Sequence, residues 1–325
     1  MSTIYCIGEA LIDFIPLEKG KALKDVEAFM KAPGGAPANV AASVAKFGGS
    51  SALITKLGVD GFGDFLVETL EEAGVNTDKI LRTEEANTGL AFVSLREDGE
   101  RDFSFYRKPS ADLLLTEDEI DDSWFKSNDI LHFCSVDLVD SPMKGAHLKA
   151  IKAAKERGAI ISFDPNVRLP LWDSAKECRF TIQSFIPLAD IIKVSHEELG
   201  FITGVSEVEA SIKKLFTGDV KAVILTQASE GCSLYVRNSK YSINGFGVKV
   251  LDTTGAGDAF VGGMLLKLIE KGATQSNLEE VLEEHYEEIL TFANGSGALS
   301  TTGHGAISSF PSKGEVERLM ESHSK

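Results

Sequence analysis

Short apolar runs alternate with segments of helical periodicity along the second half of this chain. Runs that are apolar throughout are typical of strands buried on both faces, and their alternation with helices predicts a parallel sheet covered by helices on both sides. Ligands of such α/β folds bind beyond the carboxyl ends of the strands. The predicted strands are 130–134, 159–163, 190–194 and 220–226, with a helix over 147–157 and another ending over 182–188.

The first half adds strands over 3–7 and 51–56, and a second β-rich region that does not fit this alternation. The runs 89–96 and 101–107 are joined at Asp98-Gly99, which predicts a hairpin. Phe103 and Phe105 share one face of the second strand, and Ser104 and Tyr106 share the other. We expect the hairpin to project from the main sheet, because it cannot bury both faces against one helix layer. An ordinary hairpin packed on the core is the alternative.

The stretch Asp252–Phe260 (DTTGAGDAF) is a turn of small residues before a long apolar helix. The run 248–251 before it is predicted to end a strand. Glycine lets a ligand approach the backbone closely, and the free amides at a helix start favour an anion, typically a phosphate. A carboxylate at Asp258 would repel that anion unless its role is to accept a proton, so Asp258 is a candidate base that activates a hydroxyl group for attack on phosphate. The alternative is that Asp258 only complements the helix dipole.

A second constellation lies near the amino terminus. In Pro33–Asn39, two glycines precede a proline in the first turn of a predicted helix, which indicates close backbone approach to a ligand. Asn39 offers a donor and an acceptor there, and Asp13 places a carboxylate among apolar residues, where it must be solvated or hydrogen-bonded. A turn-forming role for Asp13 and a helix-start hydrogen bond for Asn39 are the alternatives.

Composition restricts the partners of the chain. Its 325 residues carry a formal net charge of −16, which disfavours nucleic acid and anionic membrane surfaces. The four cysteines form no CxxC pair, and neither a leader segment nor an apolar run of bilayer length is evident, so we expect a cytoplasmic protein with reduced thiols and no membrane contact.

Three motifs together resemble those of one protein family. The stretch 252–260 resembles a signature of the ribokinase-like (pfkB) carbohydrate kinases, GGAPANVA at 34–41 resembles their other signature, and Tyr106-Arg107 with Ser110-Ala-Asp112 resembles the fructokinase branch. The resemblance covers nearly the whole chain. It implies a single carbohydrate kinase domain over 1–325, with a three-layer α/β fold, a mostly parallel central sheet, helices on both faces, and a small β-sheet lid formed by about 14–33 and 88–108.

The resemblance also implies roles for individual residues. Asp258 would be the catalytic base, in an anion hole for the transferred phosphoryl group. Glu198 would organise magnesium through water, beside ATP. The anion hole would comprise Gly255, Ala256 and Gly257. The sugar site would comprise Asp13, Gly34, Gly35, Asn39, Phe103, Phe105, Arg107, Arg168 and Asp258, and the nucleotide site would comprise Lys193, Ser195, Thr226, Gly231, Gly257 and Asn294. A monovalent cation, expected to be K⁺, would be bound by Asp252, Thr254, Ser300, Gly303, Gly305 and Ser309.

Two positions depart from the family pattern. Ser195 stands where the family has Asn, and Ala228 stands where a nucleotide loop usually has Gly, which permits that loop only if the φ angle of Ala228 is negative.

The activity implied is transfer of the γ-phosphate of ATP to the 6-hydroxyl of fructose, with the sugar and ATP as small-molecule partners and possible homodimerisation through the lid. Ribokinase and 2-keto-3-deoxygluconate kinase are alternatives, the latter because two arginines near a sugar would also suit a carboxylate. A sugar-sensing protein without catalytic activity is an alternative of a different class.

Overall fold

The computed structural model describes residues 2–18, 20–95, 101–237 and 239–323, and within them the chain forms two sheets. The larger sheet has the order β13-β12-β11-β10-β9-β8-β1-β4-β5. The seven strands from β11 to β5 in this order are parallel to one another, whereas β12 and β13 are antiparallel to their neighbours. The prediction of a mostly parallel sheet is therefore confirmed. Its strands are β1 (Ile4–Ile7), β4 (Ser51–Gly58), β5 (Ile80–Thr83), β8 (Ile130–Cys134), β9 (Ile160–Asp164), β10 (Ile191–Ser195), β11 (Ala222–Thr226), β12 (Cys232–Val236) and β13 (Ser239–Ile243).

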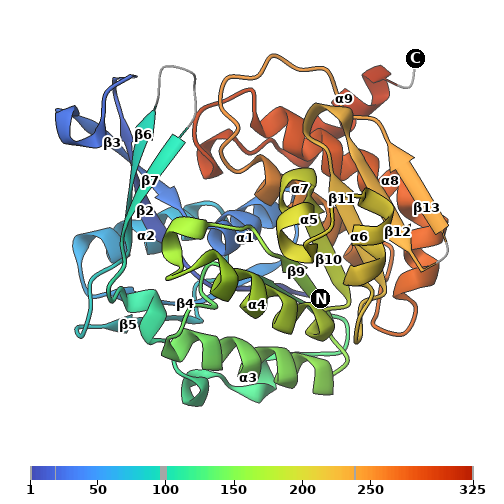
Figure 1. Cartoon of the computed structure of the whole chain (residues 1–325), viewed down its shortest axis with the longest axis horizontal. Coiled ribbons are helices and arrows are strands. Elements are labelled where there is room, and N and C mark those ends of the chain that lie inside the picture. The colour runs from blue at the N-terminus through green and yellow to red at the C-terminus, as the bar shows by residue number, and fades with distance from the viewer. Residues whose placement is uncertain (1, 19, 96–100, 238, 324–325) are drawn as a thin grey trace.

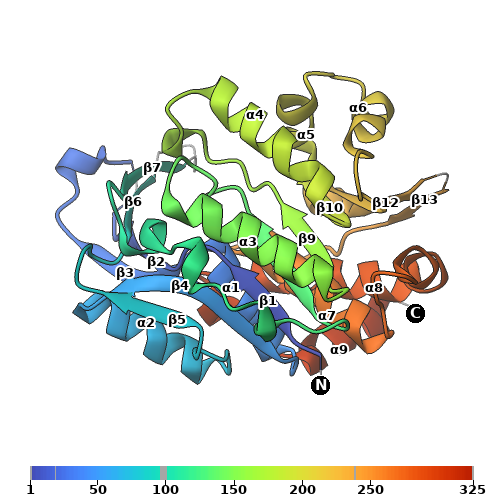
Figure 2. The same ribbon diagram turned by 90° about the horizontal axis from the view of Figure 1, so that it is seen from below.

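Helices cover both faces of this sheet, which confirms the three-layer prediction (Figure 2). Ile4 and Cys6 of β1 belong to one buried apolar cluster and Ile7 to the other, because successive side chains of a strand point to opposite faces. One face carries α1 (Ala36–Lys46), α2 (Gly61–Glu72), α7 (Ala256–Glu270), α8 (Leu278–Ser300) and α9 (Lys313–His323); the other carries α3 (Pro142–Glu156), α4 (Ala175–Phe185), α5 (His196–Thr203) and α6 (Val208–Leu215).

The smaller sheet stands at one side of the molecule, on the left in Figure 1. Its order is β3-β2-β6-β7, formed by β3 (Phe29–Gly34), β2 (Leu11–Pro16), β6 (Leu90–Leu95) and β7 (Arg101–Tyr106). β6 and β7 are antiparallel, as the hairpin prediction requires, although its Asp98-Gly99 turn lies outside the described residues. Asp13 lies within β2 opposite Ala32, so the turn-forming alternative for Asp13 is wrong.

The predicted strand end at 248–251 is also wrong. These residues form no strand, and the side chains of Val250 and Leu251 are about half exposed, at 55% and 52%. The backbone amides of Leu251 and Asp252 instead donate to the carbonyl oxygen of Thr301, at 2.8 and 3.2 Å. The segment before α7 is therefore tied to the end of α8 rather than to a sheet.

Candidate active site

A cavity of about 450 Å³ lies at the carboxyl ends of the parallel strands, where α1, α7 and the small sheet meet. This is the location expected for the ligand site of a parallel α/β fold. Many of the predicted site residues line it, namely Asp13, Gly35, Asn39, Phe105, Arg168, Lys193, Ser195, Glu198, Thr254, Gly255, Gly257 and Asp258.

The turn before α7 has the geometry of an anion site. Gly255 adopts a left-handed conformation with φ of 76°, and a Cβ atom there would lie only 2.7 Å from that of Ala306, so glycine is required. The helix begins at Ala256. The Ala256 amide donates to the Thr253 carbonyl at 3.2 Å, so the amides at Gly257 and Asp258 are better placed to hold an anion at the helix start.

Asp258 has the properties of a general base. Its carboxylate is buried and its Oδ2 accepts a hydrogen bond from Asn39 Nδ2 at 2.8 Å, which joins α7 to α1. Burial raises the pKa of Asp258 to about 6, and the negative charge of Asp164 acts in the same direction, against the lowering by Asn39, Lys193 and Arg168. The group is thus ionised at neutral pH and still basic enough to accept a hydroxyl proton.

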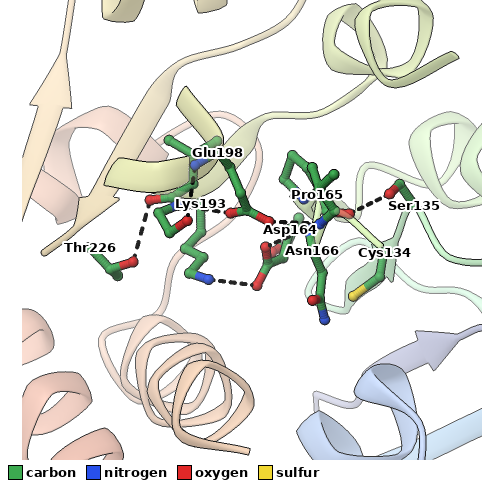
Figure 3. Close-up of polar contacts among 12 residues, drawn as sticks. Cys134, Ser135, Asp164, Pro165, Asn166, Lys193, Glu198 and Thr226 are labelled. Atoms are coloured by element: carbon green, nitrogen blue, oxygen red, sulfur yellow. Dashed lines mark hydrogen bonds and ion pairs between the residues drawn. The ribbon is translucent and has the colours of Figure 1, made fainter. Parts of the chain in front are cut away.

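The ends of β9 and β10 bring opposite charges together beside this turn (Figure 3). Lys193 Nζ contacts Asp164 Oδ2 at 2.9 Å, and a Cβ atom added to Gly257 would lie 3.4 Å from the same ammonium group. Burial alone would lower the pKa of Lys193, but Asp164 and Glu198 outweigh it and raise this pKa. A buried cation at the anion turn is suited to hold the oxygens of a phosphate.

Glu198 is held rigidly at the start of α5. Its Oε1 accepts from the amide of Val167 at 2.7 Å and its Oε2 from the amide of Ser195 at 2.9 Å, while Ser195 Oγ caps the helix in return. Ser195, which stands in place of Asn, therefore helps to orient Glu198. Within the described part of the chain, no group of three or more His, Cys, Asp or Glu side chains could hold a metal ion. Magnesium here would take its other ligands from phosphate oxygens and water, as is common for this ion.

The segments 252–254 and 300–309 meet behind the anion turn. Asp252 Oδ1 accepts from the amide and hydroxyl of Thr254, at 2.9 and 2.7 Å, and its Oδ2 accepts from the Gly305 amide at 3.0 Å. Ser309 Oγ donates to the Gly305 carbonyl at 2.6 Å, and Ser300 Oγ donates to that of Gly297 at 2.8 Å. Carboxylate, carbonyl and hydroxyl oxygens of the two segments thus lie together where the monovalent cation site was predicted.

Comparison with known proteins agrees with this geometry. Residues 1–313 match the pfkB family of carbohydrate kinases. The chain belongs to that family. It is 44% identical to fructokinase-1 of Oryza sativa subsp. japonica over 98% of both chains. A crystal structure of a fructokinase with bound ATP from Xylella fastidiosa has 39% identity and a TM-score of 0.91, over 99% of both chains. A fructokinase from Vibrio cholerae, with fructose, ADP and calcium bound, has 35% identity and a TM-score of 0.88 over 98% of this chain and 99% of that one.

Some predicted residues of this carbohydrate kinase lie outside the cavity wall. Thr226, Gly231 and Asn294 are near the ends of β11, β12 and α8 but do not line the cavity. Gly34 lies directly behind Asp13, since a Cβ atom on it would come within 2.3 Å of Asp13 Oδ2. Phe105 does line the cavity, whereas the side chain of Phe103 lies outside the described residues.

The prediction that Arg107 faces the sugar is not supported by the structure. Arg107 is 5% exposed and does not line the cavity, and its guanidinium binds the carboxylates of Asp112 and Asp137. A buried guanidinium needs such partners, because an unpaired buried charge is strongly destabilising. Arg107 therefore supports the wall of the cavity from behind.

The condition that φ be negative at Ala228 is not met. Its φ is +50°, so the alanine adopts a left-handed conformation. The surrounding loop imposes it: the amide of Gln227 donates to the carbonyl of Gly231 at 2.8 Å, and a Cβ atom on Gly231 would meet the Ile243 carbonyl at 2.1 Å.

Glu9 is a cavity residue that sequence reasoning did not select. Its signal in the sequence was an acidic side chain directly after a buried strand and Gly8.

Within the described residues no helix is long and apolar enough to cross a bilayer.

Proposed function

We propose that this carbohydrate kinase is an ATP-dependent fructokinase that transfers the γ-phosphate of ATP to the 6-hydroxyl of fructose. One observation carries the proposal: the buried carboxylate of Asp258, basic enough to accept a proton, lies in the first turn of α7 at the anion site. Asp258 would deprotonate the attacking hydroxyl, and the amides at Gly257 and Asp258 would stabilise the charge on the transferred phosphoryl group. Lys193 and Arg168 line the same cavity and supply positive charge.

Binding of the sugar falls to residues of β2 and of the start of α1. Asp13, Gly35 and Asn39 line the cavity there and offer donors and acceptors for hydroxyl groups. Phe105, on the small sheet, closes another side. We therefore infer that this sheet acts as a lid, which excludes water from the attacking hydroxyl and so disfavours hydrolysis of ATP.

The ions proposed are Mg²⁺ and K⁺. Mg²⁺ would bridge the phosphates of ATP, with Glu198 oriented by two backbone amides to hold its waters. K⁺ would be held by oxygens of the paired segments 252–254 and 300–309, and its charge would fix the anion turn that follows.

Fructose is favoured over 2-keto-3-deoxygluconate by the position of the arginines. Of the two arginines considered, Arg168 lines the cavity and Arg107 does not, so only one of the two positive charges that would suit a sugar carboxylate is present. The high identity to proteins named fructokinase points the same way.

Two further parts of the proposal concern assembly and location. Leu17, Met30 and Tyr106, in or beside the small sheet, are 67%, 50% and 62% exposed, and apolar surface of this kind supports a homodimer formed through the lid. All four cysteines are buried and unpaired, which supports a reducing, cytoplasmic compartment. Light scattering at several protein concentrations tests the dimer, and localisation of the tagged chain in its own cells tests the compartment.

A coupled ADP-release assay with fructose, ribose and 2-keto-3-deoxygluconate tests the activity. We expect kcat/KM to be highest for fructose. A rival sugar that exceeds fructose by more than about tenfold, which corresponds to about 1.4 kcal/mol of transition-state preference, would overturn the substrate. Sugar binding without ADP release above that of Asp258→Asn would instead favour the sugar-sensing alternative.

A further inference from the structure

Glu9 contributes an unpaired oxygen to the wall of the active-site cavity. It lies between β1 and β2 and is 3% exposed. Its Oε1 accepts a hydrogen bond from the amide of Ala36 at 2.9 Å, which holds the carboxyl group against the first residue of α1. Among the described residues Oε2 has no hydrogen-bond partner, although it is buried.

A second buried acceptor in the cavity lining also has no hydrogen-bond partner among the described residues. Asn39 lies one turn after Ala36 on α1, and its Nδ2 donates to Asp258, while its buried Oδ1 has no partner among the described residues. A buried acceptor without a donor costs about 1–3 kcal/mol. Two such atoms in the lining of one cavity, one of them on the side chain that binds Asp258, therefore indicate that a ligand supplies the donors, and the hydroxyl groups of a sugar are donors of the right kind.

The charges behind Glu9 explain how a carboxyl group is kept in this place. Arg107, bound to Asp112 and Asp137, attracts it electrostatically, whereas Asp137 repels it. Burial, together with Asp137, raises the pKa of Glu9 well above its ordinary value. A hydroxyl group both donates and accepts, so Oε2 can bind it in either protonation state of Glu9.

We propose that Glu9 is a sugar-binding residue that determines specificity, and that its Oε2 binds one hydroxyl group of the sugar other than the hydroxyl that is phosphorylated. The reacting hydroxyl belongs at Asp258, which is hydrogen-bonded to Asn39, whereas Glu9 is held at the amide of Ala36, three residues before Asn39. Glu9 thus selects for a hydroxyl at one fixed position of the ring. This inference rests on the proposed sugar kinase activity.

The test compares fructose with analogues that each lack one hydroxyl group other than that at carbon 6. Glu9→Gln retains an oxygen for the Ala36 amide and places an NH₂ group where Oε2 was. We expect kcat/KM for fructose to fall about tenfold, the effect of one hydrogen bond at a buried polar site. One analogue lacks the hydroxyl group that Glu9 binds, and for it kcat/KM should be the same in the variant and the wild type. For the other analogues the tenfold difference in kcat/KM should persist.

An equal loss on every analogue would assign Glu9 a structural role and overturn the proposal, as would fructose kinetics within about threefold of the wild type. Asp60→Asn is the matched control, because Asp60 likewise holds the first amides of a helix, α2, but lies outside the cavity. It should leave the pattern across the analogues unchanged. Glu9→Asp, which keeps the carboxyl group but shortens its reach, gives the same comparison if Glu9→Gln fails to fold.

The sugar preference of the wild type shows whether the proposed role of Glu9 or the proposed substrate is wrong. If the wild type prefers another sugar, the fructose assignment is wrong, and the series is measured with analogues of the preferred sugar. The role of Glu9 is then judged by the same criterion.

Discussion

Replacing Asp258 by asparagine removes the proposed base with little change of shape. In the wild type, Oδ2 of Asp258 accepts from Asn39 Nδ2 at 2.8 Å, and the amide oxygen of the variant can accept the same hydrogen bond. We expect sugar and ATP to bind as before while kcat falls by about 10²–10⁴-fold, the usual effect of losing a general base. The variant should not be less stable, because the neutral amide avoids the cost of burying a charge.

The pH profile of the wild type tests the same role independently. Since the pKa of Asp258 is raised to about 6, the base is about 97% ionised at pH 7.5 and about 9% ionised at pH 5. The rate of the chemical step should therefore fall about tenfold from its plateau as the pH drops to 5, and Asp258→Asn should lack this fall. Direct quantification of the sugar phosphate after rapid quenching avoids coupling enzymes that fail in acid. A variant rate within about threefold of the wild type, or the same acid fall in both proteins, would refute the assignment.

Three further predictions concern other parts of the structure. Ala228→Gly should raise the free energy of unfolding by up to about 1 kcal/mol in a denaturant titration, since glycine lacks the left-handed strain of alanine; a loss would contradict this reasoning. Arg107→Met should lower it by about 3–5 kcal/mol at pH 8, because buried carboxylates lose their cation. The pKa of Asp137 is already raised to about 7, so this side chain is protonated at pH 5 and the loss of unfolding free energy should be smaller there. Equal losses at pH 8 and pH 5 would contradict this explanation. Replacing K⁺ by tetramethylammonium at constant ionic strength should lower kcat, and Asp252→Asn should weaken this dependence without changing the fold as judged by circular dichroism.

The sequence by itself determined the fold class and the chemistry of the anion site. Apolar runs such as 130–134 are local patterns, and burial on both faces of a strand follows from them directly. The turn before α7 is likewise local, because Gly255 and the helix start create the site within a few residues of Asp258. Side chains at the ends of parallel strands, such as Lys193, then converge by topology alone.

Only the tertiary structure decided the features that depend on distant partners. Arg107 turned away from the cavity because Asp112 and Asp137 neutralise its buried charge, and no periodicity reports an ion pair between separate segments. Residues 248–251 form a loop, and the amide of Leu251 donates to the carbonyl oxygen of Thr301, at the end of α8, rather than to a strand. The unpaired oxygen of Glu9 became visible only when the surrounding segments were assembled, because a missing hydrogen bond is a property of the whole environment of an atom.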